Sequence, residues 1–171
     1  MKKITTTVLL LGSIFFASAQ YKSEVKFNVL NTIAIASVEV GYEFFLDDNQ
    51  SIGAEVHIND RFSYADESDT KEFDTNSVLL NYNYYFNPEN AATFYAYPFV
   101  KYRFGEHKDL VKGNTEMDSF ILGLGVGYKW AWNDKFAIGP YASIARNFNE
   151  DVSDRFSAIE ANAGISVGYR F

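Results

Sequence analysis

Two histidines, His57 and His107, are the side chains best suited to acid–base chemistry, because the sequence contains no cysteine. A hydrolytic site needs a nucleophile beside a histidine base, and a carboxylate that orients the histidine. His57 stands near Glu55 in an alternating segment, and His107 precedes Lys108 in a stretch interpreted as a loop. We find no nucleophile elbow, phosphate-binding glycine loop or cluster of zinc ligands. We therefore expect no enzyme and no cofactor, and we interpret His57 as part of a polar network.

Carboxylates are concentrated in the segment from Tyr64 to Asp74, which contains five of them. Ca²⁺ and Mg²⁺ bind oxygen ligands, so such a segment could hold a divalent cation. It lacks the glycine and the ligand spacing of an EF-hand loop. A solvated acidic loop is the simpler interpretation, and we predict no metal site.

Nine further charged residues share one face of alternating segments. They are Lys26, Glu39, Glu43, Glu55, Lys101, Arg103, Lys129, Glu160 and Arg170. If that face borders a narrow interior, the charges must be paired, because an unpaired buried charge costs several kcal/mol. We predict a network of salt bridges that fills the interior, with a gated ion path as the alternative.

The segments that carry these residues alternate between apolar residues and small or polar residues. A period of two predicts strands with one apolar face. Helical periodicity is absent after the N-terminal segment, and no repeat of solenoid or propeller length occurs. We predict eight strands, at residues 24–29, 36–46, 51–59, 77–86, 94–104, 119–132, 136–147 and 158–171.

The connections between these strands alternate in length. Tight turns rich in Asn and Asp occur at residues 47–50, 87–90 and 133–135. Longer polar segments occur at residues 61–74, 105–116 and 149–155, and a shorter one at 31–35. Short turns at one end and long loops at the other are typical of an up-and-down barrel. The predicted fold class is all-β, an eight-stranded antiparallel transmembrane barrel.

The glycines indicate which face lies inside. Every glycine in a predicted strand falls on the polar face: Gly41, Gly53, Gly123, Gly125, Gly127, Gly139, Gly164 and Gly168. An eight-stranded barrel has little interior space, so it cannot accept roughly forty mostly bulky apolar residues. We therefore expect the apolar face to point outward into lipid. A soluble barrel with an apolar interior is the alternative.

Aromatic residues are concentrated on the outward face near the tight turns. They predict a girdle at one membrane interface, formed by Tyr42, Phe44, Tyr84, Phe86, Trp130, Trp132 and Phe136. The strands have about ten residues each, the length that a tilted strand needs to cross a bilayer.

The N-terminal segment has the three parts of a secretory signal. Lys2 and Lys3 precede the apolar run from Val8 to Phe16, and small residues follow at positions 17–19. We expect residues 1–19 to be removed and residues 20–171 to form one barrel domain. The loss of both lysines leaves 13 basic residues against 22 acidic ones. The excess of acidic residues excludes a nucleic-acid partner.

The C-terminal sequence Gly168-Tyr-Arg-Phe171, with Val167 and Ile165 in phase, resembles the assembly signal of outer-membrane barrels. The signal positions would be Ile165, Val167, Tyr169 and Phe171. The chain as a whole resembles the OmpA/OmpX-like class, and residues 27–44 resemble the start of an uncharacterised barrel family of Bacteroidota. No peptidoglycan-binding domain is expected after the barrel.

This resemblance implies an outer-membrane location in a Gram-negative bacterium. The implied partners are outer-membrane lipid, lipopolysaccharide and, during insertion, the barrel assembly machinery. A cation in the acidic loop could then bridge to lipopolysaccharide phosphates. We expect a monomer with a structural or surface-interaction role, and a small channel or conduit for ions or lipophilic solutes as the alternative.

Overall fold

The computed structural model describes residues 23–60, 71–88, 92–109, 113–133 and 135–171. For residues 71–73 only the backbone is described. The predicted signal peptide and residues 64–70 of the acidic segment lie outside this part of the chain. The elements, in chain order, are β1 (Ser23–Asn28), α2 (Val29–Ile35), β2 (Val38–Phe45), β3 (Gln50–Ile58), β4 (Lys71–Tyr85), β5 (Ala92–Asp109), β6 (Thr115–Glu116), β7 (Ser119–Trp132), β8 (Phe136–Asn147), α3 (Glu150–Arg155) and β9 (Ile159–Arg170).

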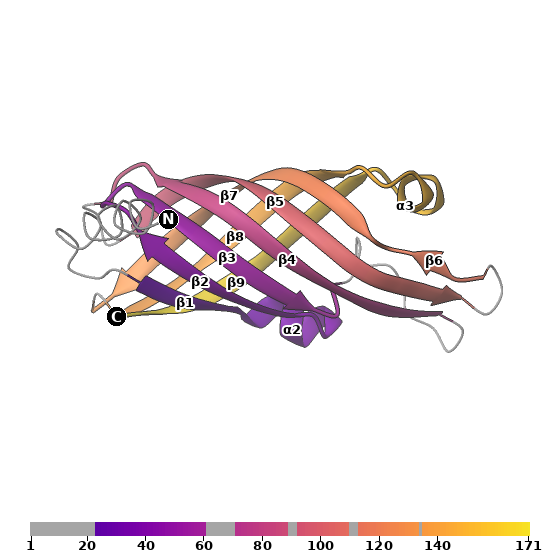
Figure 1. The fold of residues 1–171 in the computed structure, drawn as a ribbon. Helices are drawn as coiled ribbons and strands as arrows, with labels where there is room; N and C mark the ends of the chain where they lie inside the picture. Colours follow the sequence, from indigo (N-terminus) through magenta and orange to yellow (C-terminus); the bar gives the residue numbers. More distant parts are fainter. Residues whose placement is uncertain (1–22, 61–70, 89–91, 110–112, 134) are drawn as a thin grey trace, which may run out of the picture.

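Eight long antiparallel strands close into a barrel, which confirms the predicted fold class (Figure 1). Each strand pairs with its neighbours in the chain, and β9 closes the ring by pairing with β1 from Glu24↔Arg170 to Asn28↔Ser166. Beyond that ladder, the backbones of Ser23 and Phe171 exchange two hydrogen bonds, of 3.2 and 2.9 Å. The short β6 pairs only with the end of β5.

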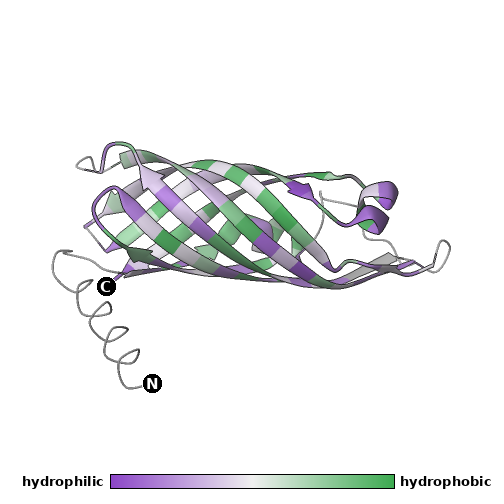
Figure 2. Cartoon of the chain, turned by 45° about the horizontal axis from the view of Figure 1, so that its top comes forward, coloured by the Kyte–Doolittle hydropathy of each residue, from purple (hydrophilic) through white to green (hydrophobic). Residues whose placement is uncertain are grey.

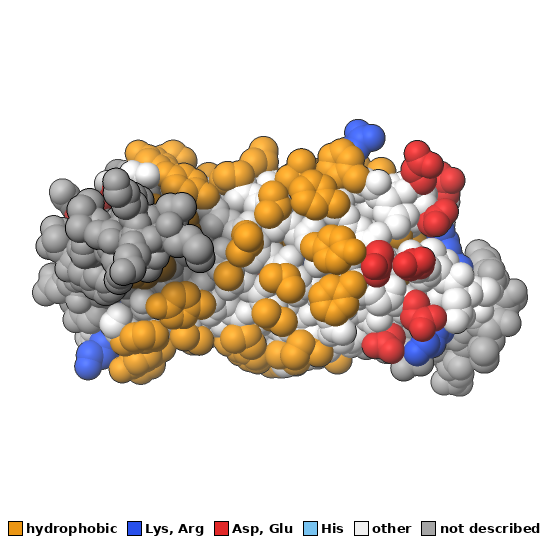
Figure 3. Space-filling view, viewed as in Figure 1, with side chains coloured by type: hydrophobic (Ala, Val, Ile, Leu, Met, Phe, Trp, Pro, Cys, Tyr) orange, Lys and Arg blue, Asp and Glu red, His pale blue; other side chains and the backbone are white. Residues whose placement is uncertain are grey.

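The apolar face of the strands points outward, as predicted. Leu124 in the middle of β7 is 64% exposed, whereas Arg103 in β5 is 1% exposed. Figure 2 shows hydrophobic and hydrophilic residues alternating along the strands, and Figure 3 shows hydrophobic side chains over the middle of the wall. In Figure 3, acidic side chains gather at the right-hand end, where the longer connections lie.

Three glycines of β7 allow a column of aromatic rings to pack inside the barrel. A Cβ on Gly123, Gly125 or Gly127 would overlap the ring of an interior β5 residue. The three rings are those of Phe99, Tyr97 and Tyr95, in that order. Adjacent rings of this column lie 5.9 and 5.7 Å apart. The interior is therefore not lined by small and polar residues alone, because the glycines on one strand make room for large rings on its neighbour.

Two short helices interrupt the predicted all-strand pattern. Asn28 caps α2 by accepting a hydrogen bond from the backbone N–H of Asn31, at 3.1 Å. Asn149 caps α3 through the N–H of Val152 in the same way, also at 3.1 Å. Asparagine at this position satisfies a helix N–H that has no partner within the helix. Helices of one or two turns are too short to give a visible period, so the sequence pattern indicated only connections at residues 31–35 and 149–155.

The strand bounds also differ from the prediction near the longer connections. The predicted loops at residues 61–74 and 105–116 are partly strand, because β4 begins at Lys71 and β5 continues to Asp109. His107 therefore lies in β5 and not in a loop. Conversely, β1 ends at Asn28, and Val29 belongs to α2.

Candidate functional site

The charged interior begins, at the long-connection end, with a group that we call the Arg103 cluster. It consists of Arg103, Lys101, Asp60, Glu160 and Asn147. Arg103 donates through both terminal nitrogens to the two oxygens of Glu160, each at 2.8 Å, and through Nε to Asp60 at 2.9 Å. Lys101 Nζ lies 3.0 Å from Asp60 Oδ2 and 3.7 Å from Glu160 Oε2. Two cations thus share two buried carboxylates.

A second group, the Lys129 cluster, lies near the tight turns. It consists of Lys129, Glu24, Glu43, Tyr85 and Arg170. Lys129 Nζ donates to Glu24 at 3.0 Å, to Glu43 at 3.1 Å and to the Tyr85 hydroxyl at 2.8 Å. The other oxygen of Glu24 accepts from Arg170 Nε at 2.8 Å, and the Tyr85 hydroxyl donates to Glu43. Aromatic rings surround the ammonium, with that of Tyr85 5.2 Å away, so the charge is held by carboxylates and π faces together.

Between the two clusters, Lys26 of β1 contacts carboxylates of β2 and β3, and His57 of β3 contacts Glu55 of the same strand and Asp60, which follows it. Lys26 Nζ lies 2.8 Å from Glu55 Oε1 and 3.6 Å from Glu43 Oε2. The ring nitrogens of His57 lie 3.4 Å from Glu55 and 3.8 Å from Asp60. The interpretation of His57 as a member of a polar network agrees with this geometry.

Glu39 differs from the other interior carboxylates because its partners are neutral. Its side chain is bound by Asn31 Nδ2, Asn28 Nδ2 and the Tyr141 hydroxyl, each at 2.7 Å. None of the ion pairs among the described residues includes Glu39. His57 lies directly opposite in the β2–β3 ladder, but its ring nitrogens contact Glu55 and Asp60. Among the described residues, Glu39 is therefore a buried carboxylate held by neutral hydrogen-bond donors.

A cavity of about 70 Å³ lies between the Arg103 and Lys129 clusters. Its lining extends from Lys26 and Glu55 to Lys101 and Arg103, and includes Glu39. A polar cavity of this size accommodates a few water molecules or a small polar group.

The comparisons with known proteins agree with this architecture. A family model described as "Protein of unknown function (DUF3575)" matches residues 4–157. The chain belongs to this family. No curated protein sequence matches it. The predicted membership of an uncharacterised barrel family is thereby confirmed.

Solved structures resemble this DUF3575 member in fold. The N-terminal barrel domain of Pseudomonas aeruginosa OprF has a TM-score of 0.66 at 14% identity, over 90% of this chain and 100% of that one. Neisserial surface protein A has a TM-score of 0.57 at 11% sequence identity, and the match covers 88% of this chain and 95% of that one. The attachment invasion locus protein Ail of Yersinia pestis has a TM-score of 0.56 at 9% sequence identity, and the match covers 90% of this chain and 100% of that one. The fold is thus that of small outer-membrane barrels.

All nine residues of the predicted charge network face the interior of the DUF3575 barrel. Sequence reasoning missed two of their partners, Glu24 and Asp60, which are 1% and 5% exposed. Glu24 stands on the polar side of the first alternating segment, so the sequence pattern could have predicted that it faces the interior. Asp60 follows the end of β3 and carried no such signal.

The predicted girdle and assembly residues lie on the outer surface. Among the girdle residues, Trp132 is 72% exposed and Phe44 is half-buried. The four assembly positions, Ile165, Val167, Tyr169 and Phe171, are 37–58% exposed. Phe136 packs on Tyr169, with 5.3 Å between ring centroids. The girdle thus contacts the C-terminal strand through Phe136 at the tight-turn end.

The remaining candidates are His107 and the described part of the acidic segment. His107 is buried beneath α3, with its ring 5.2 Å from that of Phe156. Of the acidic segment, the described side chain of Asp74 is exposed and lies 3.3 Å from Lys108. Within the described residues, no group of three or more His, Cys, Asp or Glu side chains could hold a metal ion. No helix in that part of the chain is long and apolar enough to cross a membrane.

Proposed function

We propose that this chain is an integral outer-membrane barrel whose interior is plugged by ion pairs, with a structural or surface-interaction role. The supporting observation is its sidedness: isoleucine, leucine, valine and aromatic side chains cover the outside, whereas Arg103, Lys129 and Glu43 are buried. A continuous apolar belt is unfavourable in water and favourable in lipid. Closure of the sheet also satisfies the backbone of the paired strands without water.

The arrangement of the interior charges supports the plug. Three acceptors and π faces hold Lys129 near the tight turns, and the Arg103 cluster holds four charges near the other end. Moving an ion past either cluster would break buried ion pairs, which is costly. We therefore assign no conducting role to the barrel.

The longer connections support a surface-interaction role. At that end α3 packs on Met117 through Val152, and Arg155 binds Asp109 at 3.0 Å. The exposed acidic side chains of Glu116, Asp151 and Asp154 surround this capped end. Among the similar folds, one is named a surface protein and another an attachment invasion locus protein. We propose that the acidic end, which carries the longer connections, binds partners outside the cell. The aromatic girdle at the other end contacts lipid.

Two measurements on the purified protein test this proposal. Detergent-phase partitioning should recover the chain in the detergent phase, and recovery in the aqueous phase would refute a membrane protein. In planar bilayers we expect no steady openings. Regular single-channel steps would instead favour the alternative, a small conduit for ions or lipophilic solutes.

A further inference from the structure

The helices α2 and α3 have opposite polarity, although both occupy connections at the same end of the strands. In α2 the buried residue is Asn31, whereas Leu30 and Ile33 are 43% and 79% exposed. In α3 the buried residue is Val152, and the exposed residues include Asp154. A helix at an aqueous surface buries its apolar side and exposes its polar side. The polarity of α3 fits contact with water, and that of α2 is reversed.

The polar side of α2 is joined to the barrel interior. Asn31 Nδ2 donates to Glu39 at 2.7 Å and to the side chain of Asn162 in β9 at 3.0 Å. No charged residue occurs in the sequence between Lys26 and Glu39, and both of these side chains line the interior cavity. The outer side of α2 therefore carries no charge.

The wall beside α2 is apolar on its outer surface. The β1–β9 ladder ends at Asn28↔Ser166, and α2, which follows β1, contacts β9. Beyond that ladder, the outward-facing residues of β9 are Ile165, Ala163, Ala161 and Ile159. On the other side of α2, Ile58 of β3 lies opposite Val38 of β2 and is 54% exposed. The apolar outer surface thus continues past α2 on both sides.

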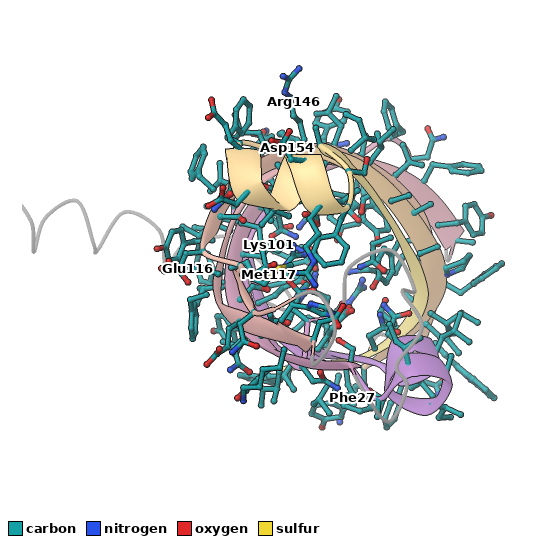
Figure 4. The ribbon with its side chains drawn as sticks, turned by 90° about the vertical axis from the view of Figure 1, so that its right-hand side faces the viewer. Phe27, Lys101, Glu116, Met117, Arg146 and Asp154 are labelled. Carbon is teal, nitrogen blue, oxygen red and sulfur yellow. The ribbon has the colours of Figure 1, made fainter. Side chains whose placement is uncertain are left out.

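The figures place α2 within the length of the apolar belt. Figure 4, viewed along the barrel from the long-connection end, shows α2 at the perimeter of the ring of strands. Figures 1 and 3 share one view, in which α2 lies well short of the far ends of β4 and β5. Over that length of the wall the side chains in Figure 3 are hydrophobic, and the acidic ones lie further to the right.

The ends of α2 have backbone groups that the protein itself satisfies. Besides the cap at the first turn, Thr32 Oγ1 donates to the carbonyl oxygens of Asn28 and Ser37, at 2.7 and 3.2 Å. The carbonyl oxygen of Ala36 accepts from Nδ2 of Asn59, which follows β3, at 3.1 Å. Water satisfies such groups at an aqueous surface, but hydrocarbon cannot. These contacts meet a requirement that a helix in lipid has and a helix in water does not.

We infer that α2 lies among the acyl chains of the outer leaflet, with Leu30 and Ile33 in contact with lipid. This inference rests on the proposed membrane location, and it limits the surface-interaction role to the other connections at that end. Lipid is the occupant because the apolar surface is continuous from β9 across α2 to β2 and β3, and lipid contacts the whole of such a belt.

A single tryptophan at position 33 tests this contact by fluorescence quenching. The native tryptophans, Trp130 and Trp132, are first replaced by phenylalanine. Ile33→Trp, Leu124→Trp and Asp154→Trp are then compared in phosphatidylcholine vesicles with and without brominated acyl chains, which quench tryptophan at close range. We expect Ile33→Trp to lose as much emission as Leu124→Trp in the middle of β7, and Asp154→Trp on α3 to lose little.

The outcomes distinguish this inference from the membrane assignment. Quenching of Leu124→Trp without quenching of Ile33→Trp would overturn the contact of α2 with lipid and leave the barrel in the membrane. A second copy of the chain seated on α2 would give that result. Quenching at neither position would refute the membrane location itself.

Thiol labelling provides a second readout with a smaller substitution. The chain has no cysteine, so Ile33→Cys and its control Asp154→Cys each carry one thiol. The thiolate is the reactive form and apolar surroundings disfavour it, so in vesicles the membrane-permeant N-ethylmaleimide should modify Ile33→Cys at least about tenfold more slowly than Asp154→Cys. In urea both thiols should react at the same rate. Equal rates in vesicles would mean that α2 is in water, which would overturn the inference.

Discussion

Arg103 and Glu160 form a two-pronged ion pair across the barrel interior, with two N–O distances of 2.8 Å. Arg103 extends from β5 and Glu160 from β9, and β7 and β8 lie between these strands in the ring. The pair therefore joins parts of the wall that are not hydrogen-bonded neighbours. Planar guanidinium–carboxylate geometry of this kind gives strong and directional bonds.

Arg103→Met should destabilise the barrel more than the double change Arg103→Met with Glu160→Met. The single change leaves the buried Glu160 without its two-pronged partner, whereas the double change removes both members of that pair and keeps Lys101 beside Asp60. We expect the single change to lower the free energy of unfolding by about 3–5 kcal/mol. The double change should also lower the free energy of unfolding, but by a smaller amount: the two losses should differ by at least about 1 kcal/mol. Urea unfolding in phospholipid vesicles measures both values.

Lys108→Met is the control for this prediction. Lys108 and Asp74 form an ion pair with 40% and 62% exposed side chains, and exposed pairs contribute about 0–1 kcal/mol. Equal losses for the single and double changes at Arg103 would mean that the buried charges are not energetically paired.

Gly125→Ala should destabilise the barrel although it adds a single methyl group. The added Cβ would overlap the Tyr97 ring, which stacks between Tyr95 and Phe99 and has little freedom to move. Overpacking of this kind typically costs about 1–3 kcal/mol. Ala142→Val is the control, because its extra methyl groups point outward. Unfolding in the same vesicles measures both changes, and a neutral result for Gly125→Ala would show that the aromatic column is loosely packed.

Leu124→Arg should reveal whether the outer surface faces lipid. Leu124 lies in the middle of β7 and is 64% exposed. An arginine at the bilayer midplane costs about 2–4 kcal/mol, and one near the interface costs about 0–1 kcal/mol. Leu46→Arg, in the tight turn after β2, is the matched substitution near the interface. Vesicle unfolding with a similar small loss at both positions would contradict the membrane-spanning assignment.

Phe171→Ala should reduce insertion into the outer membrane without preventing folding in detergent. The Phe171 backbone still pairs with Ser23 in this variant, so the change removes only the outward ring of the proposed assembly signal. Phe136→Ala is the control, since Phe136 is another exposed aromatic at the same end. The folded fraction in isolated envelopes, read from its altered gel mobility before heating, measures the effect. The same yield for both variants would argue against a signal at Phe171.

The sequence was sufficient to predict the fold because the membrane-facing strands must alternate. Alternation is lost where β4 and β5 extend past the apolar band, since Asp74, Thr75, Gly105 and Glu106 give no apolar period. These extensions pair from Lys71↔Asp109 to Asn76↔Phe104, which is a tertiary arrangement that no local pattern specifies.

The sequence could predict which types of residue face the interior, but not which of these residues contact one another. Lys129 binds Glu24, which is 105 positions away in the sequence, and the shear of the barrel decides which charges meet. The same applies to the column of Tyr95, Tyr97 and Phe99. Each ring faces a glycine of β7, and the benefit of an aromatic residue in so narrow a space is visible only once that register is known.

The pairing of β1 with β9 also determines when the molecule can mature. The ring joins the earliest described strand to the latest one, so the sheet has two unpaired edges until its final strand has formed. Such edges recruit other strands indiscriminately. A chain that ends before β9 cannot close this ring, so it keeps both open edges, and open edges favour pairing with strands of other chains.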